Sequence, residues 1–147
     1  MNEYELHSGL TILNVANKDT EKLGKGLYAI EPFATNGSGK IYEGKPSGIY
    51  QLIDDKNIRS NDARIILNFI GEEYRTLPFC SRWLVKKFGV KTLFALKQLE
   101  ENGNIHQYPQ LVEVSKGKVA QSEDTILIDD KVIVTSGVLW GRKNLHW

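Results

Sequence analysis

The sequence predicts a mixed α/β (α+β) domain in which a helical segment interrupts a β framework. Three observations support this prediction. Short apolar strands broken by Gly and Pro fill residues 1–60, helical periodicity runs through residues 61–112, and strand and turn signals return up to residue 136. Since neither β segment is large enough to fold alone, we expect residues 1–60 and 113–136 to form one domain that carries residues 61–112 as an insertion.

The predicted β framework is built from short strands. Leu27–Phe33 and Ile49–Ile53 are expected strands, and the glycine-rich segment Thr35–Lys40 is an expected turn or loop. Later in the chain two pairs of apolar runs flank turn residues and predict hairpins: Leu111–Val114 with Lys118–Gln121 around Ser115–Gly117, and Thr125–Ile128 with Val132–Val134 around Asp129–Lys131.

The inserted segment is expected to hold three helices. Ser60 or Asn61 can cap the first helix, whose apolar face would be Ile65, Ile66, Phe69 and Ile70. Thr76 and Pro78 favour the start of a second helix, which Gly89 would end, with an apolar face of Phe79, Leu84 and Phe88. The third is expected over Lys91–Glu101, with Leu93, Phe94, Leu96 and Leu99 apolar and Asn102-Gly103 after it. Three helices followed by a strand outline a winged-helix-like unit.

Composition narrows the class of protein. The chain has 147 residues, a net charge of +1 and ordinary proportions of apolar and charged residues, so it gives no reason to expect a nucleic-acid or membrane partner. The start lacks the basic and apolar regions of a secretory signal, and no apolar run is long enough to span a bilayer. The single cysteine, Cys80, fits a reducing compartment, so we expect a cytoplasmic protein.

Two carboxylates lie in or beside apolar runs of the sequence that would ordinarily pack in a core. Glu31 interrupts a predicted strand between Ile30 and Pro32, and Glu123 directly precedes the apolar run that starts at Thr125. A carboxylate on a packed strand needs a partner or a metal ion. Alternation along short strands also permits both side chains to face solvent, and the pattern by itself leaves that alternative open.

Other chemical motifs are weak or missing from the sequence. His7, His106 and His146 show no metal-ligand spacing, and no C-x-x-C is present, so a self-contained zinc site is not expected. Gly37-Ser-Gly39-Lys40 is too short for a phosphate-binding loop and lacks the helix that would follow one.

An ordered set of motifs resembles the C-terminal part of archaeal and eukaryotic type II methionine aminopeptidases over residues 4–136. The motifs are Leu6-His-Ser-Gly9, Tyr28-Ala-Ile-Glu-Pro-Phe-Ala-Thr35 with Gly37-Ser-Gly39, Thr76-Leu-Pro-Phe-Cys-Ser-Arg-Trp83, Ala95-Leu96, Tyr108-Pro109 and Val119-Ala-Gln-Ser-Glu-Asp-Thr-Ile126. The resemblance implies the C-terminal half of a pita-bread fold, and it accounts for the helical segment, because type II enzymes carry a winged-helix-like insertion at this place.

The resemblance also implies a site that removes the initiator methionine from the N-termini of nascent polypeptides. Its cofactors would be two divalent metal ions, Co, Mn, Fe or Zn, between which the sequence does not choose. Glu31 and Glu123 match the two glutamate ligands of the family, and the second of these bridges both ions. His7 matches a histidine that faces the substrate, and Tyr108 a tyrosine that borders the methionine pocket.

The sequence also departs from the family pattern. The family's two aspartate ligands and its metal-binding histidine lie N-terminal to everything that this sequence matches, and residues 137–147 match nothing in the family. The sequence therefore predicts an incomplete active site, from an altered gene product or from one half of a split enzyme that a separate N-terminal half completes.

Two functions of other classes compete with this one. The family has non-catalytic relatives that bind RNA or ribosomes, but the presence of both Glu31 and Glu123 argues against that role. Residues 61–112 could instead bind DNA as a free-standing winged helix. They hold seven Lys and Arg against five acidic residues, and this surplus is too small for a phosphate-binding face, so no DNA partner is expected.

Overall fold

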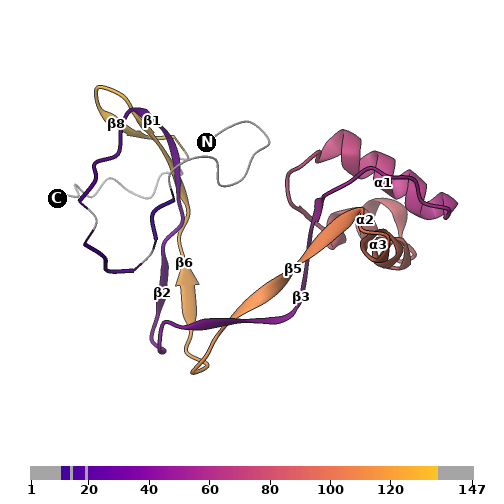
Figure 1. Cartoon of the computed structure of the whole chain (residues 1–147), viewed down its shortest axis with the longest axis horizontal. Coiled ribbons are helices and arrows are strands. Elements are labelled where there is room, and N and C mark those ends of the chain that lie inside the picture. The colour runs from indigo at the N-terminus through magenta and orange to yellow at the C-terminus, as the bar shows by residue number, and fades with distance from the viewer. Residues whose placement is uncertain (1–10, 14, 19, 136–147) are drawn as a thin grey trace. The chain divides into compact units, whose positions relative to one another are not determined.

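The computed structural model describes residues 11–13, 15–18 and 20–135 (Figure 1). The described residues form two compact units. The first unit combines the N-terminal part up to Lys40 with the C-terminal part from Glu113, and the second is the continuous segment Ile41–Val112. His7 and the tail 137–147 lie outside the described residues.

The first unit is made of five short strands. Strand β1 (Gly26–Ile30) pairs with β7 (Asp124–Ile128), β7 pairs with β8 (Val132–Val134), and β2 (Phe33–Thr35) pairs with β6 (Val119–Gln121). All three pairings are antiparallel. The hairpin predicted around Asp129–Lys131 is thus confirmed as β7–β8. The predicted strand Leu27–Phe33 is divided in two, because Glu31 and Pro32 separate β1 from β2.

The second unit places three helices beside a small sheet. The elements are β3 (Ile41–Leu52), α1 (Asn61–Glu73), β4 (Phe79–Cys80), α2 (Ser81–Phe88), α3 (Thr92–Glu101) and β5 (Ile105–Glu113), and the sheet order is β4-β3-β5. The three helices lie together at one end of this unit, and β3 and β5 run away from them (Figure 1). The compact unit begins at Ile41, before the expected boundary at residue 61, because β3 pairs with both β4 and β5.

A closed hydrophobic core holds the second unit together. Ile70 of α1, Leu84 of α2 and both Leu96 and Leu99 of α3 have no exposed surface, and Phe79 is 1% exposed. The ring of Phe79 stacks on that of Tyr74, with centroids 5.1 Å apart. Helix α1 packs on α3, and α2 on α3, so each of the three helices contributes its apolar face to one core.

Local signals start or end these helices at the residues that the sequence predicts. The Ser60 side chain accepts a hydrogen bond from the backbone N–H of Ala63 at 3.3 Å and so caps α1. Gly89, with φ of 83°, follows α2, and Gly103, with φ of 74°, follows α3. Both glycines adopt the left-handed backbone region that other residues enter at a cost, so the chain turns there instead of continuing as helix.

The start of the second helix was predicted wrongly. Thr76 and Pro78 do not begin a helix, since Phe79 and Cys80 form β4 and pair with Tyr50 and Ile49 of β3. Helix α2 starts at Ser81. The Thr76 carbonyl accepts a hydrogen bond from Gln51 Nε2 at 2.8 Å, so this segment is held against β3.

Some residues expected in the core are exposed. Leu93 and Phe94 of α3 are 51% and 67% exposed. Helix α3 buries Thr92, Ala95, Leu96 and Leu99 instead. Several apolar side chains close together in sequence cannot all share one helical face, and packing against α1 and α2 selects which of them are buried.

The hairpin predicted around Ser115–Gly117 is also wrong. The two runs that flank this turn join different sheets: Leu111–Glu113 belongs to β5, in the sheet β4-β3-β5, whereas Val119–Gln121 is β6 and pairs with β2. Residues 115–117 therefore lead the chain from one sheet into the other. Of the helices that the structure describes, none has the length and apolarity needed to cross a membrane.

Candidate metal site

The site begins with the register of the strands in the first unit. Ile30 lies opposite Asp124 in the β1–β7 pair, and Phe33 lies opposite Gln121 in the β2–β6 pair. The residue numbers of each pair add to 154, so one register continues through both ladders without a bulge. This register places Glu31 directly opposite Glu123.

The hydrogen-bond pattern shows which kind of pair the two glutamates form. The Ser122 N–H donates to the Pro32 carbonyl at 3.2 Å, so residues 32 and 122 are a hydrogen-bonded pair. Hydrogen-bonded and non-hydrogen-bonded pairs alternate along an antiparallel ladder. Glu31 and Glu123 are therefore a non-hydrogen-bonded pair, in which Cα atoms lie about 4.5 Å apart and the side chains are closest. Directly opposite residues also share one face of the ribbon.

Gln121 extends this polar group on the same face. It lies two residues before Glu123, and its Nε2 donates a hydrogen bond to Glu31 Oε1. The amide thus holds one carboxylate oxygen of Glu31. The sequence pattern did not single out Gln121 as part of this group. Its spacing of two from Glu123 was the available signal, since residues i and i+2 of a strand lie on the same face.

The two carboxylates face solvent in the described chain. Glu31 and Glu123 are both exposed. Within the described ranges, no group of three or more His, Cys, Asp and Glu side chains is arranged to hold a metal ion. The chain thus brings together two carboxylates, whose oxygen atoms are of the kind that can ligate a divalent metal ion, and one amide that donates to one of them.

Tyr108, expected near the substrate, belongs to the second unit. It lies on β5 and is half-buried, and its hydroxyl donates a hydrogen bond to Gln51 Oε1. Its carbonyl accepts a hydrogen bond from Ser47 Oγ at 2.6 Å, and the His106 ring meets its ring edge-on at 5.2 Å. Tyr108 is therefore held at both ends against β3.

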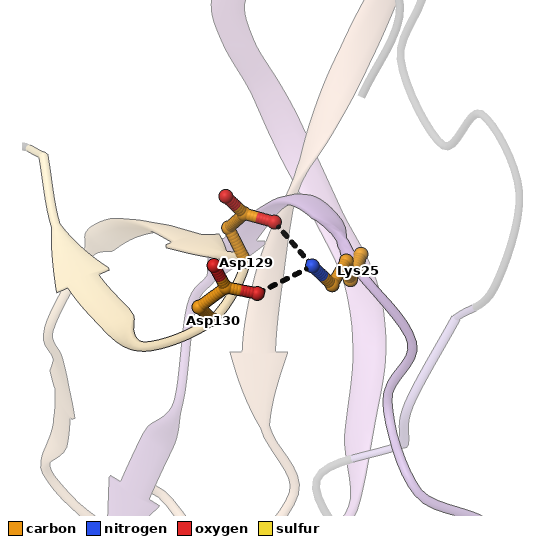
Figure 2. A network of polar contacts seen from close by, with 3 residues as sticks. All are labelled: Lys25, Asp129 and Asp130. Atoms are coloured by element: carbon orange, nitrogen blue, oxygen red, sulfur yellow. Dashed lines mark hydrogen bonds and ion pairs between the residues drawn. The ribbon is translucent and has the colours of Figure 1, made fainter.

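A second polar group in the first unit lies at the tip of the β7–β8 hairpin. The Lys25 Nζ lies 2.7 Å from a carboxylate oxygen of Asp129 and 2.7 Å from one of Asp130 (Figure 2). These hydrogen bonds raise the pKa of Lys25. The three side chains are exposed, and the group joins the residue before β1 to the turn after β7, so it is a structural tie.

Comparison with known proteins finds close sequence relatives. The chain is 43% identical to a methionine aminopeptidase of Pyrococcus abyssi over 137 residues, which cover 90% of this chain and 46% of the relative. It is 40% identical to one of Methanocaldococcus jannaschii, covering 88% of this chain and 44% of the relative. For one of Saccharolobus solfataricus the identity is 37%, with 90% and 46% covered. The chain thus spans about half the length of the curated relatives that it matches.

Comparison with solved structures gives a fold of the same type. A thermophilic Arx1, a protein of the pita-bread fold, superposes with a TM-score of 0.62 and 17% sequence identity, over 74% of this chain and 29% of that one. At that identity the likeness concerns the fold alone. No family model matches the chain.

Proposed function

Because the chain belongs to the methionine aminopeptidase family and spans about half the length of its relatives, we propose that it is one half of a dinuclear-metal enzyme. The enzyme would remove the initiator methionine from the N-termini of nascent polypeptides. The observation that carries the proposal is the register that sets Glu31 opposite Glu123, 92 positions apart in sequence, on one face of one ribbon.

The donor set fits the proposed ions. Two carboxylates at a non-hydrogen-bonded pair offer oxygen atoms to one region of space, and Co, Mn, Fe and Zn ions all accept such ligands. Glu31 and Glu123 would hold the pair of ions. Bound there, two ions supply a nucleophile from water near neutral pH and polarise the scissile carbonyl.

Other residues of the chain would position these ligands and the substrate. Gln121 holds Glu31 through its amide and would orient this carboxylate toward an ion. Tyr108, fixed by Gln51 and Ser47, would border the pocket for the methionine side chain. His7 would face the substrate.

A partner that carries the rest of the catalytic domain completes this proposal. Strands β1, β7 and β8 bear apolar side chains on both faces, and Leu27, Ile30, Ile133 and Val134 are each at least 39% exposed. Such apolar surface favours burial against another layer of structure. A polypeptide that supplies the remaining half of the relatives' length, including the other metal ligands, would provide that layer.

The second unit is assigned to the insertion that distinguishes type II enzymes. We interpret its three helices and sheet β4-β3-β5 as winged-helix-like, and we expect no duplex DNA binding because its charge is nearly balanced. A cytoplasmic location, where nascent chains are processed, belongs to the same proposal.

The proposal is tested by complementation. The chain alone should not release methionine from a Met-Ala-Ser peptide in Mn²⁺ or Co²⁺, because two carboxylates do not fix two ions in a reactive geometry. Adding the part of a methionine aminopeptidase that this chain does not match should restore metal-dependent release. Glu123→Gln and Glu31→Gln should each abolish the restored activity.

Asp124→Asn is the matched control, since it changes the acid next to Glu123 that points to the other face of β7. This variant should keep most of the restored activity. Metal-dependent release by the chain alone, or restored activity that survives Glu123→Gln, would show that the glutamate pair is not the metal site.

A further inference from the structure

A buried carboxylate lies where the chain leaves and re-enters the first unit. The chain leaves after Lys40 and returns at Glu113, which is 3% exposed. Glu113 accepts hydrogen bonds from Ser38 Oγ at 2.7 Å, Ser115 Oγ at 2.8 Å and Gly117 N at 2.8 Å, and also from the Ser38 backbone N–H. A buried charge of this kind is stabilised by donors from two segments, and it thereby ties those segments together.

The two tied segments are in backbone contact. A Cβ atom on Gly37 would lie 2.4 Å from the carboxyl carbon of Glu113, and one on Gly117 would lie 2.5 Å from the Gly37 Cα. Neither position has room for a side chain, so glycine is required at both for close approach. We call residues 36–38, Glu113 and 115–117 the carboxylate clasp.

The clasp continues directly into the ladder that leads to the glutamate pair. The Lys118 N–H donates to Asn36 Oδ1 at 2.8 Å, and Thr35 Oγ1 donates to the Lys118 carbonyl at 2.8 Å. The next pair is Thr35 with Val119, and three pairs further along the same register Pro32 faces Ser122. The clasp is thus the fixed end of the ribbon that carries Glu31 and Glu123.

The β2–β6 ladder that joins the clasp to the glutamate pair is too short to fix the register by itself, and beyond the pair the same register continues in the five residue pairs of β1 and β7. Strands β2 and β6 form three residue pairs, and every residue in them is exposed. Register is weakly specified where no face of a strand is buried, and a slip of one residue turns every side chain to the other face. In this ribbon such a slip would move Glu123 away from Glu31.

We propose that Glu113 is a positioning residue for the candidate metal site: its carboxylate clasps residues 36–38 to 115–117 and so keeps Glu31 opposite Glu123. The role of Glu113 in catalysis rests on the proposed function. Its effect on register does not, and register can be measured without metal or substrate.

Cross-strand disulfides report the register directly. A non-hydrogen-bonded pair at about 4.5 Å between Cα atoms lies within disulfide geometry, so Glu31→Cys with Glu123→Cys should bridge readily in a thiol redox buffer. Glu31→Cys with Ser122→Cys reports a slip of one residue. Peptide mapping by mass spectrometry separates these bridges from any that involve Cys80.

Glu113→Gln should lower the equilibrium constant for the 31–123 bridge about tenfold relative to the 31–122 bridge, since charge-assisted hydrogen bonds are lost. The amides of Lys118 and Ser122 should exchange faster, while those of the β7–β8 hairpin keep their protection. Asp130→Asn, which removes an exposed acid of the same unit, should change neither measurement. An unchanged bridge ratio in Glu113→Gln would overturn the proposal.

Two further measurements cover a variant that destabilises the whole unit and the dependence on the proposed function. If Glu113→Gln also removes the amide protection of β7–β8, the whole unit is destabilised, and Ser38→Ala is the variant to measure instead. Ser38→Ala should lower the equilibrium constant for the 31–123 bridge by less than tenfold. An unchanged constant in Ser38→Ala would overturn the proposal. Mn²⁺ titration of the complemented enzyme separates the register role of Glu113 from the proposed function of the chain. Weaker Mn²⁺ binding in Glu113→Gln supports both, whereas a register effect without any Mn²⁺ binding in the unsubstituted enzyme overturns the proposed function and leaves the register role in place.

Discussion

The two units of this chain are stabilised in different ways. The second unit, Ile41–Val112, contains every buried apolar side chain that the structure describes, from Tyr50 to Ile105. Among the described residues of the first unit, the one that is buried is a carboxylate, Glu113. Packing therefore holds the second unit, whereas backbone pairing and polar ties hold the first. As far as the structure describes it, the unit with the candidate metal ligands has no core of its own.

The difference bears on function. Metal ligands must be held in fixed geometry, and a sheet whose described side chains are half-buried or exposed does not hold them well by itself. The apolar residues on both faces of β1, β7 and β8 are what a sheet inside a larger domain would carry. The second unit needs no such cover, which agrees with an insertion that folds around its own core.

The largest expected effect is on the core of the second unit. Leu96→Ala removes a side chain with no exposed surface and should destabilise this unit by about 2–5 kcal/mol. Ile133→Ala in β8, where the side chain is 40% exposed, should cost less than about 1 kcal/mol. Amide hydrogen exchange resolved by residue measures both. Equal losses of stability in the two variants would contradict the view that packing stabilises the second unit more than the first.

The next effect is a pH dependence confined to the first unit. Hydrogen bonds from the Ser38 side chain, and then from Gly117 and Ser115, outweigh the opposing effect of burial and lower the pKa of Glu113 from its ordinary 4.5 to about 2. Since this pKa is lower in the folded chain, ionised Glu113 stabilises the unit above about pH 4.5, and the stabilisation disappears as the pH falls toward 2.

Amide exchange of Lys118 measured from pH 6 to pH 3 tests this, after correction for the intrinsic pH dependence of exchange. Protection should fall with pH in the unsubstituted chain and stay flat and lower in Glu113→Gln. Parallel profiles in the two proteins would show that Glu113 is not the group that titrates.

A smaller effect is expected at the start of α1. Ser60→Ala removes the side-chain acceptor for the Ala63 N–H and should destabilise the second unit by about 1 kcal/mol. Ser60→Asp, which keeps an acceptor and adds a charge favourable at a helix N-terminus, should restore the loss. Urea unfolding followed by helical circular dichroism measures both variants, and equal stability of Ser60→Ala and the parent would contradict the capping role.

Sequence analysis succeeded where the signal is local. The α1 cap at Ser60, the helix ends at Gly89 and Gly103, and the β7–β8 hairpin all depend on residues within a few positions of one another. The sequence assigned Glu31 and Glu123 to one metal site only through resemblance to a family, because local patterns carry no information on pairing across 92 positions.

The failures have the same physical origin. The runs on either side of Ser115–Gly117 look like a hairpin locally, yet β3 and β2, far earlier in the chain, pair with them instead. Glu113 was placed in a strand, and only the folded chain brings Gly37 and Ser38 against it. Glycine at both 37 and 117 was the one sequence signal for that close approach. The roles of His7 and Tyr108 stay predictions.

The smallest expected effect separates the two kinds of polar tie in the first unit. Lys25 bridges Asp129 and Asp130, but the three side chains are 60–91% exposed, so water and salt screen the ion pairs (Figure 2). Lys25→Met should therefore leave the protection of the β7–β8 amides unchanged within error at 0.15 M salt, and lower it slightly at 0.01 M. Glu113→Gln should show no such dependence on salt, because its donors are neutral groups around a buried oxygen pair. If Lys25→Met loosened the hairpin as much as Glu113→Gln loosens β2–β6, exposed ion pairs would hold the first unit as firmly as the buried carboxylate, and the special role of the clasp would be lost.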